Sequence, residues 1–197
     1  VYNFTGPQGF GIANVADSLY AIKTLVFDEK KVTLAEYKRA LALNFGKGFD
    51  AITIQEMTQD VLKELKKAGQ TPSGAQIAGI VKGIAQTELS GEDRELCDRL
   101  YAMIEEVPKF GNDIDEVDAF ARDVAYTYTK PLQKYRNPRG GMVQAGLYPV
   151  SANVPLGAQT GATPDGRLAH TPVADGVSPS AGKDVHGPTA TANSVSR

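Results

Sequence analysis

The sequence predicts an α/β chain that is mainly helical over residues 1–135 and continues with one strand and long ordered loops over residues 136–197. Apolar residues recur at helical spacing through the first part, and residues 143–152 alternate in the way typical of a strand. Gly and Pro recur every few residues between positions 154 and 188. That stretch is neither repetitive nor strongly charged, so we expect a packed loop and not a disordered linker.

The first helix is expected over residues 14–29, packed on something larger. Its apolar residues share one face: Val15, Leu19, Ile22 and Val26. Thr33 and Glu36 form the capping box of a second helix, because a Thr hydroxyl and a Glu three residues later satisfy each other's backbone donors. Gly46 is expected to end that helix.

Three further helices follow, over residues 54–68, 77–84 and 93–106, the last with Ser90 as its cap. Cys97 lies on the apolar face of the third of these helices. Since a buried cysteine is a common small hydrophobic residue, we assign it no catalytic role.

Residues 113–116 are predicted to cap another helix, which Pro131 must kink or break because it lacks a backbone donor. Four carboxylates gather at its start: Asp113, Asp115, Glu116 and Asp118. They could hold a metal ion, but negative charges favoured by the helix dipole explain them better.

The strand at residues 143–152 places Gln144, Tyr148, Val150 and Ala152 on one face. Pro149 cannot donate to a sheet ladder, so we expect a bulge there or an edge position.

The next feature is a turn made by Thr163, Pro164, Asp165, Gly166 and Arg167. Pro presets φ, Asp bonds its own backbone and Gly accepts a positive φ, so the chain reverses and presents the Arg. A buried Arg that ties the loop down is favoured over a catalytic one.

Composition excludes several classes of protein. The formal charge of −2 gives no basic surface for nucleic acid, and a single cysteine excludes a disulfide framework. No apolar run reaches membrane-spanning length, so we expect a soluble, cytoplasmic protein. His170 and His186 lack metal-ligand spacing and are expected to tether the loop.

Several motifs resemble those of the glycyl radical enzymes, the relatives of pyruvate formate-lyase. The resemblance covers nearly the whole chain except residues 53–91. Its motifs are Tyr2-Asn3-Phe4-Thr5-Gly6-Pro7-Gln8-Gly9, Pro108-Lys109-Phe110-Gly111-Asn112, Arg136-Asn137-Pro138-Arg139-Gly140-Gly141, Gly161 to Arg167, Ala174-Asp175-Gly176-Val177-Ser178-Pro179 and Gly187-Pro188-Thr189-Ala190 to Ser196.

The resemblance implies part of a ten-stranded α/β barrel, with residues 143–152 as one barrel strand and residues 1–197 as a segment of a single catalytic domain. Members carry a Gly-Cys-x-Glu loop and an Arg-Val-x-Gly-Tyr radical loop, and neither motif occurs here. We therefore expect a segment that lies between the two loops, with no catalytic residue and no directly bound cofactor or metal of its own. The radical would be installed by a radical S-adenosylmethionine activating enzyme.

Within the family, residues 146–155 look most like the glycerol and propane-1,2-diol dehydratases, which remove water by thiyl-radical hydrogen abstraction. A neutral amide at Gln144 argues against an anionic sulfonate. Tyr148, Val150 and Gln144 would bind the substrate, with Phe110 and Asn153 as weaker candidates. The alternatives are another lyase or decarboxylase of the family, acting on arylacetate, choline, isethionate or pyruvate, or a non-catalytic fragment.

The resemblance also implies partners and a setting. We expect a homodimer that takes a small-molecule substrate and is activated by the S-adenosylmethionine enzyme, with neither nucleic acid nor membrane as a partner. The setting would be the cytoplasm of an anaerobic bacterium, with a microcompartment as a second location.

Overall fold

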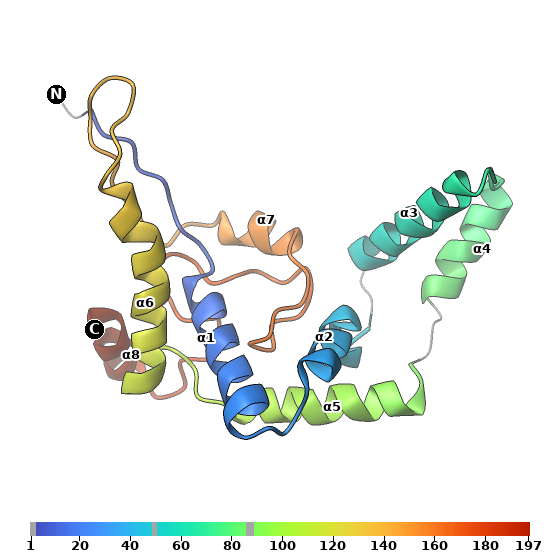
Figure 1. Ribbon diagram of the computed structural model, residues 1–197, viewed down its shortest axis with the longest axis horizontal. Coiled ribbons are helices and arrows are strands. Elements are labelled where there is room, and N and C mark those ends of the chain that lie inside the picture. Colours follow the sequence, from blue (N-terminus) through green and yellow to red (C-terminus); the bar gives the residue numbers. More distant parts are fainter. Residues whose placement is uncertain (1–2, 49–50, 86–88) are drawn as a thin grey trace.

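A computed structural model describes residues 3–48, 51–85 and 89–197. Figure 1 shows helices joined by long loops. The helices are α1 (Ile12–Ile22), the π-helix η1 (Lys23–Asp28), α2 (Leu34–Ala42), the 3-10 turn η2 (Asn44–Gly46), α3 (Ala51–Lys67), α4 (Gly74–Ala85), α5 (Gly91–Glu106), α6 (Asp115–Leu132), α7 (Asn153–Ala158) and α8 (Pro188–Ser196). Tyr2 of the opening motif and residues 86–88 of the unmatched stretch lie outside the described residues.

The first predicted helix is present as α1 and η1, but only half of the predicted face is buried, because Ile22 and Val26 pack against the core while Val15 and Leu19 do not. Val15 is 48% exposed and Leu19 is 45% exposed. The buried face carries small and polar residues: Ala13, Asn14, Ala16, Asp17, Ser18, Tyr20 and Ala21. Hydrophobicity misjudged the α1 end of the face, because polar residues there are buried against partners from distant loops, as described below.

The capping box at the start of α2 is confirmed. The Glu36 backbone N–H donates to Thr33 Oγ1 at 3.2 Å, and the Thr33 N–H donates to Glu36 Oε2 at 2.7 Å. The Thr33 hydroxyl also donates to Glu36 Oε2, at 2.8 Å, and this bond and the one from the Thr33 N–H lower the pKa of the Glu36 carboxyl. Helix α2 ends at Ala42, before the expected Gly46, and η2 fills the interval.

Helices α3 and α4 pack on each other and project from the body as an arm (Figure 1). Both were predicted from apolar spacing. Ser73 caps α4 by accepting from the Gln76 N–H at 3.4 Å, while Gln76 Oε1 accepts from the Ser73 N–H at 2.8 Å. The arm is therefore built from the same local signals as the helices of the body.

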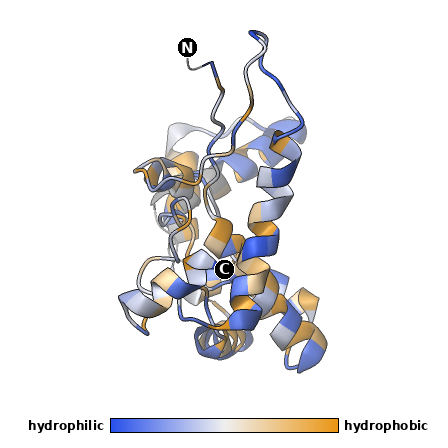
Figure 2. Cartoon of the chain, turned by 90° about the vertical axis from the view of Figure 1, so that its left-hand side faces the viewer, coloured by the Kyte–Doolittle hydropathy of each residue, from blue (hydrophilic) through white to orange (hydrophobic). Residues whose placement is uncertain are grey.

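The hydrophobic core lies between α1, α2, α5 and α6. Cys97 is fully buried there, as predicted for a small hydrophobic residue. The Tyr20 and Phe120 rings pack edge to face with centroids 5.5 Å apart, joining α1 to α6. The largest fully buried apolar side chains are Tyr37, Phe45, Leu25, Leu100, Ile104 and Val117. Figure 2 shows hydrophobic and hydrophilic residues alternating along the helices of this body.

The predicted strand at residues 143–152 is wrong: the part of the chain that the structure describes holds only isolated bridges, Thr5 with Val143 and Gln8 with Gly146 in parallel among them. Thr5 N donates to the Met142 oxygen at 3.0 Å, and Gly9 N donates to the Gly146 oxygen at 3.0 Å. In a parallel ladder the donor between them would be residue 7, but Pro7 has no N–H. The pairing is therefore interrupted.

The described helices include none with both the length and the apolar character needed to cross a membrane.

Replacing Thr33 by Ala removes the hydroxyl that caps α2. We expect the free energy of unfolding to fall by about 1 kcal/mol, the usual cost of losing an N-cap. Denaturant unfolding of the wild type and variant measures the change. Thr33→Ser keeps the hydroxyl and serves as the control, so an equal loss in both variants would contradict a capping role.

Candidate functional site

The predicted substrate-binding residues on the extended segment 142–150 lie at the surface. Tyr148 is 63% exposed and Val150 is 40% exposed, and Gln144 is also exposed. The segment is held from one side, where Gln144 N donates to the Thr5 oxygen at 2.9 Å and Gly146 N donates to the Pro7 oxygen at 2.8 Å. The structure thus brings these three side chains onto one exposed segment with a fixed main chain.

Phe110 lies apart from that surface. It is 7% exposed, and its backbone N–H donates to Asp17 Oδ1 at 2.8 Å. Its side chain lines a cavity of about 290 Å³, together with Leu147 and Val177. Tyr148, the next residue after Leu147, is not among the lining residues. The structure therefore does not place Phe110 beside the Tyr148 side chain.

Asn153, the other weaker candidate, holds a loop in place. Its side-chain Nδ2 donates to the Val173 oxygen at 3.0 Å, and its backbone oxygen accepts from the Val173 N–H at 3.3 Å. Both contacts attach the first residue of α7 to the Gly/Pro-rich loop, so the described contacts of Asn153 are structural.

Arg167 follows the turn as expected and donates to carbonyls of its own loop. Its Nη1 lies 2.6 Å from the Thr171 oxygen, and its Nη2 donates to the Thr160 and Gly161 oxygens. Burial lowers the pKa of the guanidinium. These contacts describe an Arg that ties down the loop.

Asp165 attaches the same turn to α1. It is 3% exposed and accepts from Asn14 Nδ2 at 2.6 Å, and its backbone N–H donates to Ser18 Oγ at 3.1 Å. The Tyr37 hydroxyl donates to the Pro164 oxygen at 2.6 Å, and burial followed by the charge of Asp165 raises the Tyr37 pKa. The turn is thus buried against α1 and α2.

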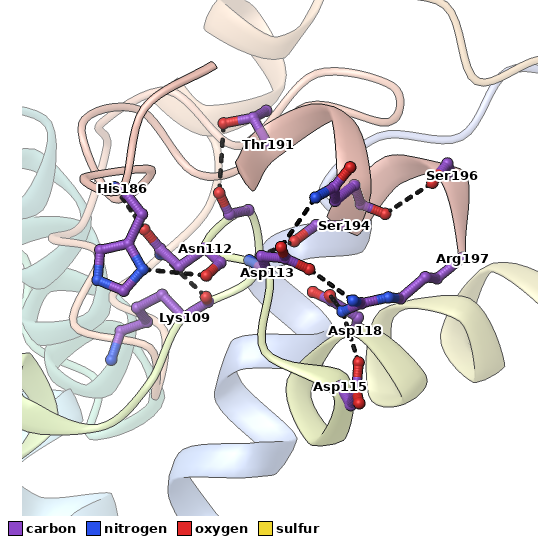
Figure 3. A network of polar contacts seen from close by, with 12 residues as sticks. Lys109, Asn112, Asp113, Asp115, Asp118, His186, Thr191, Ser194, Ser196 and Arg197 are labelled. Atoms are coloured by element: carbon purple, nitrogen blue, oxygen red, sulfur yellow. Dashed lines mark hydrogen bonds and ion pairs between the residues drawn. The ribbon is translucent and has the colours of Figure 1, made fainter. Parts of the chain in front are cut away.

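The acidic residues at the start of α6 bind Arg197 (Figure 3). Its guanidinium lies 2.5 Å from Asp113 Oδ1, 2.7 Å from Asp115 Oδ1 and 2.8 Å from Asp118 Oδ2. Asp113 was expected to cap α6, but the helix has no side-chain cap, and Asp113 N donates to Ser194 Oγ at 2.8 Å instead. These carboxylates therefore fix α8 against α6.

Other sequence predictions concern Pro131, the two histidines and a metal site. Helix α6 passes Pro131 and ends at the next residue. Nδ1 of His170 lies 2.7 Å from the Ala158 oxygen, and Nδ1 of His186 lies 3.0 Å from the Asn112 oxygen, so both rings tether loops. Among the described residues, no group of His, Cys, Asp and Glu could hold a metal ion.

Sequence reasoning missed a buried charged cluster beside α1. Asp17 is fully buried, and its Oδ2 has no hydrogen-bond partner. Burial raises the pKa of Asp17 to about 7, against the lowering effects of the Phe110 N–H and Lys109. Lys109 is 6% exposed and donates to the Ile104 and Val107 oxygens, and burial lowers its pKa. The polar stripe of Asn14, Asp17 and Ser18, at helical spacing, is the signal that could have revealed it.

The comparisons with known proteins agree with one another. A family model described as Pyruvate formate lyase-like matches residues 1–157. Probable dehydratase YbiW of Escherichia coli is 35% identical over 100% of this chain and 19% of its own length. Isethionate sulfite-lyase of Bilophila wadsworthia is 30% identical over 95% of this chain and 17% of its own length.

Two solved structures are also similar. One describes 1,2-propanediol dehydration in Roseburia inulinivorans, with a TM-score of 0.89 and 62% identity, covering 98% of this chain and 23% of that one. The other is the glycerol-bound B12-independent glycerol dehydratase of Clostridium butyricum, with a TM-score of 0.68 and 43% identity. The match covers 99% of this chain and 19% of that one. This chain thus spans about a fifth of the length of the relatives that it matches.

Asp17 makes stability depend on pH. Its folded pKa of about 7 lies above the ordinary value of 3.8, so between these pH values the folded chain holds a proton that the unfolded chain has lost. The stabilisation that the protonated Asp17 side chain contributes to the folded state is fully present below about pH 4. It is lost as the pH rises to about 7. Asp17→Asn keeps an oxygen for the Phe110 N–H and removes the titration.

We therefore expect the variant to gain stability relative to the wild type between pH 4 and pH 8. Urea unfolding across this range measures the difference, with Asp60→Asn on the arm as an exposed control. A constant difference between Asp17→Asn and the wild type would contradict the assignment.

Proposed function

Because this chain belongs to the pyruvate formate lyase-like family of glycyl radical enzymes, we propose that it is the part of a radical diol dehydratase that provides one wall of the substrate pocket. The reaction would remove water from glycerol or propane-1,2-diol. The observation that carries the proposal is the exposed segment with Tyr148 and Val150, whose main chain is bonded to segment 5–9 from residue 142 to residue 148, within a chain 62% identical to the propanediol-dehydration structure.

The chemistry of this wall suits a small neutral diol. Tyr148 offers an aromatic face and a hydroxyl, Val150 offers an apolar contact, and Gln144 offers a neutral amide. A pocket of this kind excludes water with its apolar parts and orients hydroxyl groups with its few polar ones. An anionic sulfonate would need a guanidinium or a similar donor cluster. The wall therefore favours a polyol.

The radical chemistry itself would come from outside the described wall. The family's radical supplies hydrogen abstraction from the substrate, and the single cysteine of this chain is not suited to that step. Cys97 is fully buried in α5, and burial raises the pKa of its thiol. Tyr148, Val150 and Gln144 would bind and orient the substrate, while segment 5–9 holds their main chain in place.

The wider setting belongs to the same proposal. The complete enzyme would be activated by a radical S-adenosylmethionine enzyme and would act as a homodimer in the cytoplasm of an anaerobic bacterium, with a microcompartment as a second location. Within one catalytic domain, this chain would add helices over residues 1–135 and the extended segment and loops over residues 136–197. A non-catalytic role is the alternative of a different class.

The substrate is tested by incubating the activated full-length protein anaerobically with glycerol, propane-1,2-diol, choline, isethionate and an arylacetate in separate reactions. We expect 3-hydroxypropanal from glycerol and propanal from propane-1,2-diol, each with one water released. Unactivated protein is the control. Release of trimethylamine, sulfite or carbon dioxide instead would identify another lyase, and no product from any substrate would favour the non-catalytic alternative.

Replacing Tyr148 by Ala removes the aromatic part of the proposed wall. We expect diol turnover to fall at least about tenfold, because misplacing a substrate even slightly is costly, while the glycyl radical signal in electron paramagnetic resonance stays the same. Tyr135, which is 61% exposed, provides the matched control as Tyr135→Ala. Unchanged turnover in Tyr148→Ala would remove Tyr148 from the pocket.

A further inference from the structure

The ring of Tyr148 lies directly against Gly146. A Cβ added at Gly146 would lie 2.7 Å from Cε2 and 3.2 Å from Cδ2 of that ring. Carbon atoms in contact need about 3.5 Å or more, so any side chain at position 146 would displace the ring. Gly146 is itself buried, although Tyr148 is 63% exposed. One edge of an otherwise open ring is therefore supported by main chain.

The carbonyl of Tyr148 is held by a second segment. Gln8 Nε2 donates to the Tyr148 oxygen at 2.9 Å. Gln8 is placed for this bond by its neighbours, because the Pro7 oxygen accepts from Gly146 N at 2.8 Å and Gly9 N donates to the Gly146 oxygen at 3.0 Å. The segment that pairs with residues 142–146 thus also fixes the main chain at Tyr148.

A third segment presses on the peptide before Tyr148. A Cβ added at Gly176 would overlap the Leu147 oxygen and would lie 2.6 Å from the Tyr148 carbonyl carbon. Gly176 belongs to the Ala-Asp-Gly-Val-Ser-Pro motif, whose turn is closed by the Ser178 N–H donating to the Asp175 oxygen at 2.8 Å. This motif is therefore packed against the candidate site by its glycine.

From these contacts we infer that Gln8, Gly146 and Gly176 are positioning residues, which together form a seat that fixes the orientation of Tyr148 toward substrate. The inference rests on the proposed function of Tyr148. An exposed tyrosine normally samples several rotamers. Here the ring meets Gly146, and the main chain of Tyr148 is held by Gln8 and Gly176, so less conformational freedom remains to be lost when substrate binds. The seat would therefore act on how the substrate is held and would not act on radical formation.

The first test replaces Gly146 by Ala in the activated full-length enzyme, alone and together with Tyr148→Ala. Because the added methyl group moves the ring, we expect kcat/KM for the diol to fall at least about tenfold with Tyr148 present, and less than about twofold when residue 148 is already Ala. The glycyl radical signal should not change. Gly161→Ala, where nothing lies within 4 Å of the added Cβ, is the matched control. An equal loss in both backgrounds overturns the inference.

The second test is Gln8→Glu, which keeps the shape of the side chain but replaces the donor by an acceptor facing the Tyr148 carbonyl. We expect a fall in kcat/KM for the diol of at least about fivefold, and Gln70→Glu in an exposed loop controls for the added charge. Unchanged kcat/KM in Gln8→Glu overturns the role of Gln8.

Thermal unfolding of the Gly146 and Tyr148 variants distinguishes a failure of the proposed role of Tyr148 from a failure of the seat. Full turnover in Tyr148→Ala, together with a Gly146→Ala loss of stability that depends on Tyr148, refutes the proposed role of Tyr148 in the pocket. The seat is then a purely structural contact, which overturns its positioning role. The seat alone is refuted if Gly146→Ala lowers stability equally with Tyr148 or Ala at position 148, while Tyr148→Ala still lowers turnover.

Discussion

The buried side chain of Asn14 joins α1 to three separate points of the long Gly/Pro-rich loop. Its Nδ2 donates to Asp165 Oδ2 at 2.6 Å and to Ser180 Oγ at 3.1 Å, and its Oδ1 accepts from the Ala174 N–H at 2.7 Å. A buried amide left without partners costs about 1–3 kcal/mol, so these bonds specify where the loop lies. Because Ala174 is next to Asp175 and Gly176, the same amide also determines where the loop meets Tyr148.

Polar side-chain contacts hold the loops of residues 136–197 in place, because these loops lack regular backbone pairing. Arg167 satisfies carbonyls of its own loop, Asn153 holds Val173, and Arg197 joins the end of α8 to the acidic start of α6. The Asp118 carboxylate that Arg197 meets is fully buried, and a buried polar group needs such a partner. These loops are therefore held by specific hydrogen bonds and ion pairs.

The elements predicted best were those governed by neighbours in the sequence. The capping box of Thr33 and Glu36 and the apolar face of α5 that carries Cys97 both depend on residues three or four positions apart. The extended segment 143–152 was predicted, but it does not form a regular strand. Its pairing with segment 5–9 is interrupted by Pro7, which lies more than a hundred residues away in the sequence. Of the predicted site, Tyr148, Val150 and Gln144 share one exposed segment, whereas Phe110 is buried against Asp17 and Asn153 holds a loop. Both partners are distant in the sequence, so the sequence could not reveal these contacts.

The sequence by itself determined helices α1 to α6, the caps of α2 and α5, the turn before Arg167 and the family motifs, since each depends on chain neighbours. Helices α7 and α8 formed within the predicted loops, and α6 lacks its predicted cap. The tertiary structure decided which face of α1 is buried, because Asn14 and Asp17 meet partners from other parts of the chain. It also decided that Asp113, Asp115 and Asp118 bind Arg197, and that Gly146 and Gly176 meet Tyr148. The physical reason is that hydrogen bonds, ion pairs and steric contacts act over a few ångströms, whatever the separation along the chain.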